Sequence, residues 1–246
     1  MRVAAIYDIH GNLPALEAVV DDIRRSGVDE IVVGGDVLPG PMPRETLAFL
    51  AELDIPTRYI RGNGDRAVLE QLTGVEPITL AEQYREVVRW TASQLGEEHA
   101  RVLASWPRTL RVEIDGSREV LFCHATPRSD TELFTRLTSD ERLTSVFEGV
   151  GAGLVVCGHT HMQFDRMVAH TRLVNAGSVG MPFGEPGAYW LRLGPDVELR
   201  RTMYDLDAAA ARIRSTSYPR ASEFAEREIL QPRSEAEMLE LFGHGE

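Results

Sequence analysis

The chain has 246 residues, of which 43% are hydrophobic and 26% are charged, and its formal net charge at pH 7 is −12. This length and composition are ordinary for a soluble globular protein of one large α/β domain or two small ones. No apolar run approaches the roughly 18 residues that a membrane span needs. No dense basic run offsets the negative charge, which disfavours a nucleic-acid partner.

Two features of the sequence favour a cytoplasmic protein. The N-terminal stretch MRVAAIYDIHGN has a short apolar run but no basic region followed by a small-residue cleavage site, so we expect no signal peptide. Only Cys123 and Cys157 are present, and each ends an apolar run. This pattern predicts buried, reduced thiols in strands rather than a disulfide framework.

The first part of the chain alternates between strand and helix patterns. Strands are expected at 2–7, 30–36 and 56–63, and helices at 12–25, 43–53 and 65–72. In the first helix Leu13, Leu16 and Val20 follow three- and four-residue intervals, and Pro14 suits a first helical turn. The alternation is typical of a mostly parallel sheet flanked by helices.

The second part of the chain has a different pattern. The segment 81–105 is charged and helical, and it interrupts the alternation as a helical insert. Strands are expected at 109–114, 118–124, 153–161, 163–170, 171–178, 188–194 and 197–206, with a turn at 115–117 and a loop and helix over 126–150. Short strands separated by turns predict more antiparallel sheet.

The C-terminal tail, residues 207–246, has the pattern of two or three polar helices broken by Pro219 and Pro232. No repeat, low-complexity tract or linker divides the chain. We therefore predict a single domain over 1–246, with its core at about 1–205 and the insert and the tail added to it.

Short polar motifs fall at the predicted strand ends, where ligands of open α/β sheets bind. They supply seven candidate metal ligands: Asp8 and His10 (DIH), Asp36 (GGD), Asn63 (GNGD), His124 (CH), and His159 and His161 (GHTH). In DIH and GHTH the two side chains are separated by one residue, so in an extended strand they would share one face. All seven side chains can then converge on one crevice.

These ligand types predict a site for divalent cations. Carboxylate and amide oxygens with imidazole nitrogens suit Mn²⁺, Fe, Zn²⁺, Ni²⁺ or Co²⁺. Two such cations bring four positive charges and two aspartates return two negative ones, so the loaded site would attract a phosphate anion. Singly, each residue has a structural alternative: a buried histidine, a helix cap for Asp8, or a turn for Asp36 or Asn63. The ordered combination favours the metal site.

The ordered set DIHGN, GGD, GNGD, CH and GHTH resembles the calcineurin-like metallophosphoesterases over about residues 1–205. The resemblance is strongest to their small bacterial and archaeal phosphodiesterase branch. It implies an α/β fold, a four-layer α-β-β-α sandwich with two mixed β-sheets, and a dinuclear metal site at the strand ends. One metal, with Mn²⁺ the expected ion, would be held by Asp8, His10 and His161, the other by Asn63, His124 and His159, and Asp36 would bridge both. A metal-bridging hydroxide would attack phosphorus in line.

Position 64 departs from the family pattern. Many members have Gly-Asn-His-Asp, in which the histidine helps to protonate the leaving oxygen, whereas this chain has Gly64. Loss of such acid assistance typically costs about 10²–10⁴ in rate, most with a poor leaving group. If that loss limits the rate, Gly64→His should raise activity on a poor leaving group. Tyr7 also stands where a smaller residue is common, which we expect to alter packing alone.

Other residues near the motifs have two interpretations each. Asp65 either supports Asn63 or a metal-bound histidine, or caps a helix. Arg128, four residues after His124, is a candidate substrate contact together with Asn63, or else a surface arginine. The Gly-rich loop 175–184 either lies beside the site or forms a tight turn.

The sequence thus predicts a metal-dependent phosphohydrolase, most simply a phosphodiesterase acting on a small phosphoester. The alternative is a non-catalytic metal-binding scaffold of the same fold, which Gly64 favours and for which the retromer subunit that resembles this family is a parallel. A nuclease of the superfamily is disfavoured by the net charge of −12. Neither a nucleic-acid nor a membrane partner is expected.

Overall fold

The computed structural model describes residues 1–78, 80–114 and 118–243, so the predicted turn at 115–117 lies outside the described residues. Its ten strands are β1 (Val3–Ile6), β2 (Glu30–Val33), β3 (Thr57–Tyr59), β4 (Thr109–Ile114), β5 (Arg118–Cys123), β6 (Leu154–Cys157), β7 (Phe164–Val168), β8 (Thr171–Asn175), β9 (Ala188–Leu193) and β10 (Val197–Thr202). Each matches a predicted strand, but several end earlier than the sequence indicates.

The helices in the described parts of the chain follow the predicted order. They are α1 (Leu13–Arg25), α2 (Pro43–Ala51), α3 (Asn63–Leu72), α4 (Glu82–Ser93), α5 (Glu97–Ser105), α6 (Asp140–Phe147), α7 (Leu206–Arg214), α8 (Ala221–Phe224), the π-helical segment η1 (Ala225–Leu230) and α9 (Glu235–Gly243). Pro14 lies in the first turn of α1, and Asn12 caps that helix by accepting a hydrogen bond from the amide of Ala15. Pro219 and Pro232 separate the helical segments of the tail, as expected.

The strands form two five-stranded mixed sheets. The first has the order β10-β9-β1-β2-β3, in which β1, β2 and β3 are parallel and β9 is antiparallel to both of its neighbours, β1 and β10. The second has the order β4-β5-β6-β8-β7, in which β5, β6 and β8 are parallel and the two edge strands are antiparallel. The predicted pair of mixed sheets is confirmed.

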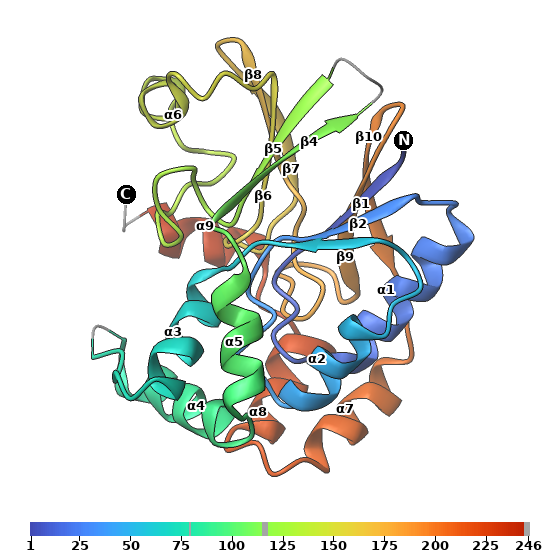
Figure 1. Ribbon diagram of the computed structural model, residues 1–246, viewed down its shortest axis with the longest axis vertical. Helices are drawn as coiled ribbons and strands as arrows, with labels where there is room; N and C mark the ends of the chain where they lie inside the picture. Colours follow the sequence, from blue (N-terminus) through green and yellow to red (C-terminus); the bar gives the residue numbers. More distant parts are fainter. Residues whose placement is uncertain (79, 115–117, 244–246) are drawn as a thin grey trace.

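Alternating side chains of the strands divide the core into layers. Val3 and Ala5 of β1 pack between the two sheets, whereas Ala4 and Ile6 face the helices on the outer side of the first sheet. All four are buried because both faces of this strand are covered. On the outer side of the second sheet α6 packs Leu143 and neighbouring apolar residues against the strands. The result is the predicted four-layer sandwich (Figure 1).

The insert and the tail pack against each other at one end of the molecule. Figure 1 shows α4, α5, α7 and α8 gathered below the two sheets. Val87 of α4 shares a cluster with Ala210 and Ile213 of α7. Trp90 of α4 meets Tyr218 edge to face, with ring centroids 5.2 Å apart. Two segments far apart in the sequence therefore form one surface.

Two further predictions concern the cysteines and the helices. Cys123 and Cys157 are free thiols, and both are buried. Across the described residues, none of the helices combines the length and the apolar character that spanning a membrane requires.

Candidate metal centre

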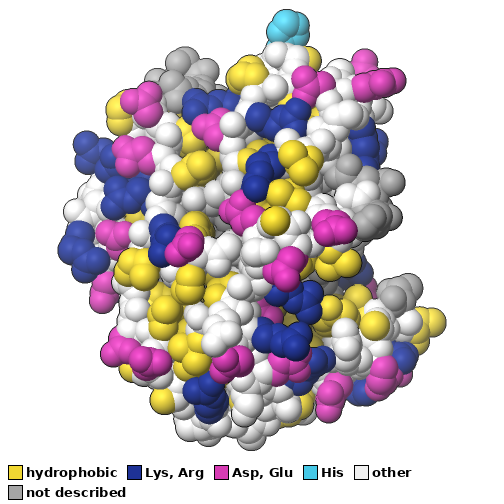
Figure 2. All heavy atoms as spheres, turned by 180° about the vertical axis from the view of Figure 1, so that it is seen from behind, with side chains coloured by type: hydrophobic (Ala, Val, Ile, Leu, Met, Phe, Trp, Pro, Cys, Tyr) yellow, Lys and Arg dark blue, Asp and Glu magenta, His cyan; other side chains and the backbone are white. Residues whose placement is uncertain are grey.

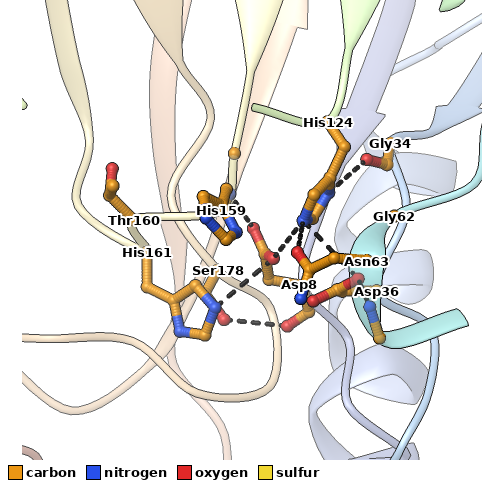
Figure 3. A network of polar contacts seen from close by, with 12 residues as sticks. Asp8, Gly34, Asp36, Gly62, Asn63, His124, His159, Thr160, His161 and Ser178 are labelled. Carbon is orange, nitrogen blue, oxygen red and sulfur yellow. Dashed lines mark hydrogen bonds and ion pairs between the residues drawn. The ribbon is translucent and has the colours of Figure 1, made fainter. Parts of the chain in front are cut away.

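The seven candidate ligands meet at the carboxyl ends of the strands, and Figure 3 labels all of them except His10, which lies beside Asp8 and His161. Asp8 and His10 follow β1, Asp36 follows β2, His124 follows β5, His159 and His161 follow β6, and Asn63 is the first residue of α3 after β3. The ligand atoms of Asp8, His10 and His161 lie within 4.8 Å of one another, as do those of Asp8, Asp36 and His124. The structure therefore brings together side chains from both sheets.

The backbone at these positions explains the convergence and corrects the sequence argument. Left-handed φ angles occur at Asp8 (53°), His10 (48°), Asp36 (50°), His159 (66°) and His161 (57°). Strands β1 and β6 end before these residues, so the two side chains of DIH and of GHTH do not share a face of an extended strand. Tight left-handed turns direct them instead. Such strained non-glycine residues are typical of functional sites.

One half of the centre contains buried polar atoms without partners. Asp8 Oδ1 lies 3.3 Å from His161 Nε2 and 4.0 Å from His10 Nε2, and His10 Nε2 lies 3.7 Å from Asp36 Oδ2. Asp8 Oδ1 and His10 Nε2 are buried and have no hydrogen-bond partner among the described residues. Because unpaired buried polar atoms are costly, these residues fit a cation that would be held between them.

The other half is built around Asp36 and His124. Asp36 Oδ1 lies 3.5 Å from His124 Nε2, and the amide oxygen of Asn63 lies 3.0 Å from the same nitrogen. With its amide turned over, Asn63 would place its nitrogen at this position, 3.0 Å from both His124 Nε2 and His159 Nδ1. An amide nitrogen there donates hydrogen bonds to the rings, whereas an amide oxygen there fits a cation shared with them. Both arrangements place Asn63 with the predicted second set of ligands.

Backbone carbonyls hold three of the histidine rings by their outer nitrogens. The Nδ1 atoms of His10, His124 and His161 lie 3.3, 3.0 and 2.7 Å from the carbonyl oxygens of Pro39, Gly34 and Met181. A hydrogen on Nδ1 donates to each carbonyl and leaves Nε2 with a lone pair toward the centre. This is the usual arrangement around metal-binding histidines.

The pKa values show how the carboxylates attract positive charge. Burial alone would raise the pKa of Asp8, but His161 and His124 beside it lower that pKa. Burial likewise opposes charge on His124, yet the Asp36 carboxylate raises the pKa of His124 to about 10. Burial and the proximity of His124 lower the pKa of His159 to about 4. A divalent cation would replace the proton on His124, so metal binding is expected to release protons.

Asp65 holds the backbone of the centre. Its carboxylate accepts hydrogen bonds from the amides of Asp36 (2.8 Å), Leu38 (3.0 Å) and Gly62 (3.0 Å). Burial and the charge of Asp36 raise the pKa of Asp65 to about 7, against the lowering effect of these donors. Of the two interpretations drawn from sequence, the structure shows the helix cap. It adds a clamp on the loop of Asp36 that the sequence did not predict.

The Gly-rich loop after β8 braces the turns that carry the ligands. Asn175 Nδ2 donates to the carbonyl of Gly158 (2.7 Å) and to Thr160 Oγ1 (3.1 Å). Ser178 Oγ donates to the carbonyl of Asp8 (2.8 Å), and both Asn175 and Ser178 are fully buried. These side chains therefore position the left-handed turns. The only sequence signal for them was an Asn and a Ser in a glycine-rich loop after a strand.

Gly64 lies where the structure leaves no room for a side chain. A Cβ atom built on Gly64 would lie 2.2 Å from the carbonyl oxygen of Leu38. The amide of Gly64 donates to Asp36 Oδ1 at 2.7 Å. A histidine here would have to displace the loop that carries Asp36. The expected gain from Gly64→His is therefore opposed by the packing of this loop.

Tyr7 packs between the two sheets beneath the centre. Its hydroxyl donates to the carbonyl of Val156 in β6 at 3.1 Å, and its side chain is fully buried. A Cβ on Gly34 would lie 2.0 Å from the Tyr7 ring, so the glycine makes room for the tyrosine. The expectation that Tyr7 alters packing agrees with this contact.

Arg128 lies outside the candidate centre in this structure. Its guanidinium donates to Glu132 at 2.9 Å, and it does not line the cavity over the ligands. Arg66, which follows the third motif, instead pairs with Asp130 at 2.7 Å. A substrate contact by Arg128 stays a prediction, and the geometry gives it no support.

A cavity of about 600 Å³ opens over the centre. Its floor contains His10, Asp36, Asn63, His159 and His161, and its walls come from α4 and the tail. A second cavity of about 650 Å³ lies between α2 and α5, and none of the candidate ligands lines it. The first cavity is therefore the one in which a bound molecule would reach the centre.

Comparisons with known proteins agree with this architecture. A family model described as a calcineurin-like phosphoesterase superfamily domain matches residues 1–193. An uncharacterised protein of Methanocaldococcus jannaschii is 29% identical over 238 residues, covering 88% of this chain and 93% of its own. A hypothetical protein from Pyrococcus horikoshii OT3 superposes with a TM-score of 0.79 at 20% identity, over 95% of this chain and 99% of that one. A metallophosphoesterase from Sphaerobacter thermophilus superposes with a TM-score of 0.70 at 27% identity, over 93% and 100%.

Proposed function

The chain belongs to the calcineurin-like phosphoesterase superfamily, and from that premise we propose that it is a phosphodiesterase dependent on two divalent cations. The observation that carries the proposal is the unpartnered pair of buried atoms, Asp8 Oδ1 and His10 Nε2, within a cluster of carboxylates and imidazoles. A purely structural cluster would satisfy these atoms with each other or with neighbours.

In this proposal the residues divide into two sets that share one carboxylate. Asp8, His10 and His161 would hold one cation, Asn63, His124 and His159 would hold the other, and Asp36 would serve both. The mixture of oxygen and nitrogen donors suits Mn²⁺. Two divalent cations would supply Lewis acidity and lower the pKa of water from about 15.7 to about 7, as in-line attack on phosphorus requires.

The chain's own residues then have three tasks. The carbonyls of Gly34, Pro39 and Met181 keep the imidazole lone pairs directed inward. Asp65 and Ser178 fix the backbone from which the aspartates extend. The cavity above the floor would hold the ester.

Small phosphoesters are the substrate class that the charges favour. On the face shown in Figure 2, Lys and Arg side chains are interspersed with Asp and Glu, and no continuous basic surface is seen there. With a net charge of −12, long-range attraction to a nucleic acid is unfavourable. Because Gly64 provides no acid, we expect turnover to depend strongly on how acidic the leaving group is.

The test is turnover of bis(p-nitrophenyl) phosphate and of p-nitrophenyl phosphate with added Mn²⁺, with and without a chelator. We expect hydrolysis of the diester that a chelator abolishes and that His161→Ala removes. His170→Ala is the matched control, because His170 is exposed in the turn between β7 and β8. If the wild type hydrolyses the diester no faster than His161→Ala with any divalent metal, the hydrolase proposal is wrong. Mn²⁺ binding by calorimetry without turnover would then favour the scaffold alternative.

A further inference from the structure

The walls of the cavity over the metal centre come largely from the C-terminal tail. Tyr218, Phe224, Met238, Leu241 and Phe242 line it together with residues of α4. The tail follows residue 193, where the match to the family model ends. The shared family domain therefore supplies the floor of this cavity, and a segment outside the match supplies much of its wall.

An aromatic surface leads from the floor to this wall. Phe183 stacks on the ring of His161, with centroids 5.4 Å apart and an interplanar angle of 20°. Phe242 of α9 meets Phe183 at 6.2 Å and 61°. A planar group attached to a phosphoryl group at the floor would meet these rings first, and aromatic pairs at such separations attract each other.

Two large apolar side chains line the cavity from different elements, α4 and α9. Tyr84 of α4 is 56% exposed and Leu241 of α9 is 53% exposed, and both line the cavity. An apolar group bound between them would remove apolar surface from water on both sides, which favours binding. Pockets of roughly 300–1,000 Å³ with apolar linings typically hold small organic ligands.

The charges of the wall complement an anionic ligand. Arg227 and Arg233 line the cavity, and neither forms an ion pair with any of the described residues. Arg220, in contrast, is paired with Glu223. Glu228, whose pKa is raised by burial, also lines the cavity and has no ion pair within the described parts of the chain. Both arginines interact electrostatically with Glu228, but two positive charges against one carboxyl group leave these three side chains net positive, which favours an anion on a chain of net charge −12.

We propose that this cavity selects phosphoesters that carry an aryl or heteroaryl group. The phosphoryl end lies at the metal centre, and the ring lies between α4 and α9, against Phe183 and Phe242. The placement of the phosphoryl group at the metal centre rests on the proposed function. The ring site adds the specificity that the floor alone does not provide.

The test measures binding rather than turnover. Calorimetry compares methylphosphonate with phenylphosphonate on the Mn²⁺-loaded full chain. We expect phenylphosphonate to bind about tenfold more tightly, because it differs only in carrying a ring in place of the methyl group. Tyr84→Ala and Leu241→Ala should each reduce that ratio at least about threefold. Leu137→Ala, at a leucine that is 70% exposed and does not line the cavity, should leave the ratio unchanged.

Equal affinity of the wild type for the two phosphonates would overturn the proposal, and so would an equal ratio in Leu241→Ala and Leu137→Ala. The outcome is separable from that of the turnover assay. A preference for the aryl ligand without hydrolysis of bis(p-nitrophenyl) phosphate would support the ring site and contradict the hydrolase. Hydrolysis without any aryl preference would contradict the ring site alone.

Discussion

The loops that carry the candidate ligands contact one another through buried hydrogen bonds, whereas the helices above them face the cavity with apolar side chains and unpaired charges. We refer to residues 8–12, 34–39, 62–65, 124 and 158–161 as the ligand loops, and to α4 with residues 218–242 as the cavity wall. In the ligand loops Asp65 accepts hydrogen bonds from backbone amides, and the carbonyl of Asp8 accepts one from Ser178 of the neighbouring Gly-rich loop. In the cavity wall Tyr84 and Leu241 are more than half exposed.

The difference indicates how the two regions respond to substitution. A metal centre requires ligand atoms at fixed positions, so small displacements of the ligand loops should lower metal affinity. A wall of apolar side chains can change shape without disturbing those positions. We therefore expect changes in the loops to affect metal binding and changes in the wall to affect the choice of ester.

Asp36→Ala should have the largest effect. Asp36 contacts both halves of the centre, at 3.7 Å from His10 and 3.5 Å from His124. We expect Mn²⁺ affinity and diester turnover to fall by more than about 100-fold, since even partners outside the ligand shell are worth 10–100-fold. Calorimetry and the chromogenic assay measure this. Asp54→Ala, at an aspartate with a 71% exposed side chain, is the control. Unchanged metal affinity in Asp36→Ala would contradict the assignment of the ligand loops.

Asp65→Asn should lower Mn²⁺ affinity by about 10–100-fold without removing a ligand. The amide cannot accept all three backbone hydrogen bonds that the carboxylate accepts from Asp36, Leu38 and Gly62. Asp205→Asn, at the cap of α7, is the control, because asparagine caps helices as well as aspartate does. Equal metal affinity in the two variants would show that the clamp does not position Asp36.

Gly64→Ala and Gly64→His test whether the lack of space for a side chain or the lack of an acid at position 64 determines turnover. Because a Cβ would lie 2.2 Å from the Leu38 carbonyl, we expect both variants to lose about 1–3 kcal/mol of unfolding free energy and some turnover. Gly153→Ala is the control, since an added Cβ there meets no atom within 4 Å. Urea unfolding and turnover of a diester with a poor leaving group measure the outcome. Turnover above that of the wild type in Gly64→His, but not in Gly64→Ala, would support the explanation that the wild type lacks an acid at this position.

Trp90→Ala should separate the cavity wall from the ligand loops. The variant loses the ring contact with Tyr218, and for a partly buried side chain we expect a loss of about 1–2 kcal/mol of stability, less than for a fully buried Trp. The tail should become more sensitive to protease, while Mn²⁺ affinity stays unchanged. Tyr84→Ala, on the same helix, should leave stability unaltered. A fall in metal affinity in Trp90→Ala would show that the two regions are coupled.

Asp130→Asn should have the smallest effect, and one that depends on pH. Burial would raise the pKa of Asp130, but Arg66 at 2.7 Å outweighs it and lowers that pKa below the ordinary 3.8. Stability from this pair is therefore present above about pH 4 and is lost as the pH falls through the lowered pKa. Because Arg66 is partly exposed, we expect at most about 1 kcal/mol at pH 7. Urea unfolding should show this difference at pH 7 and none near pH 2; a difference of equal size at both values would contradict the assignment.

The order of elements and the convergence of the candidate residues could be predicted from the sequence because both depend on local patterns, whereas their binding of metal stays a prediction. Apolar intervals in α1 and the motif order across Asp8, Asp36 and His124 sufficed. The strand ends were predicted too late, since the polar residues that follow β1 and β6 adopt left-handed turns rather than extended backbone. Local composition does not distinguish these two conformations for Asp and His.

The clamp and the cavity wall could not be predicted because they depend on contacts between distant segments. Asp65 has the local signature of a helix cap, and only the folded chain shows that the Asp36 loop is bound to it. Val87 and Ile213 pack together although more than 100 residues separate them. Neither helix pattern alone indicates which face the other will cover.

The position of the tail in the chain has a consequence for biosynthesis. Both sheets are complete once β10 ends at Thr202, and Phe242 follows 40 residues later. At about 5–20 residues per second, the ribosome adds that segment in about 2–8 s. During this interval every candidate ligand has already been made while the wall is still missing. Under the proposed function, we therefore expect cations to reach the candidate ligands of a nascent chain through an open entrance, before the helices of the tail narrow it.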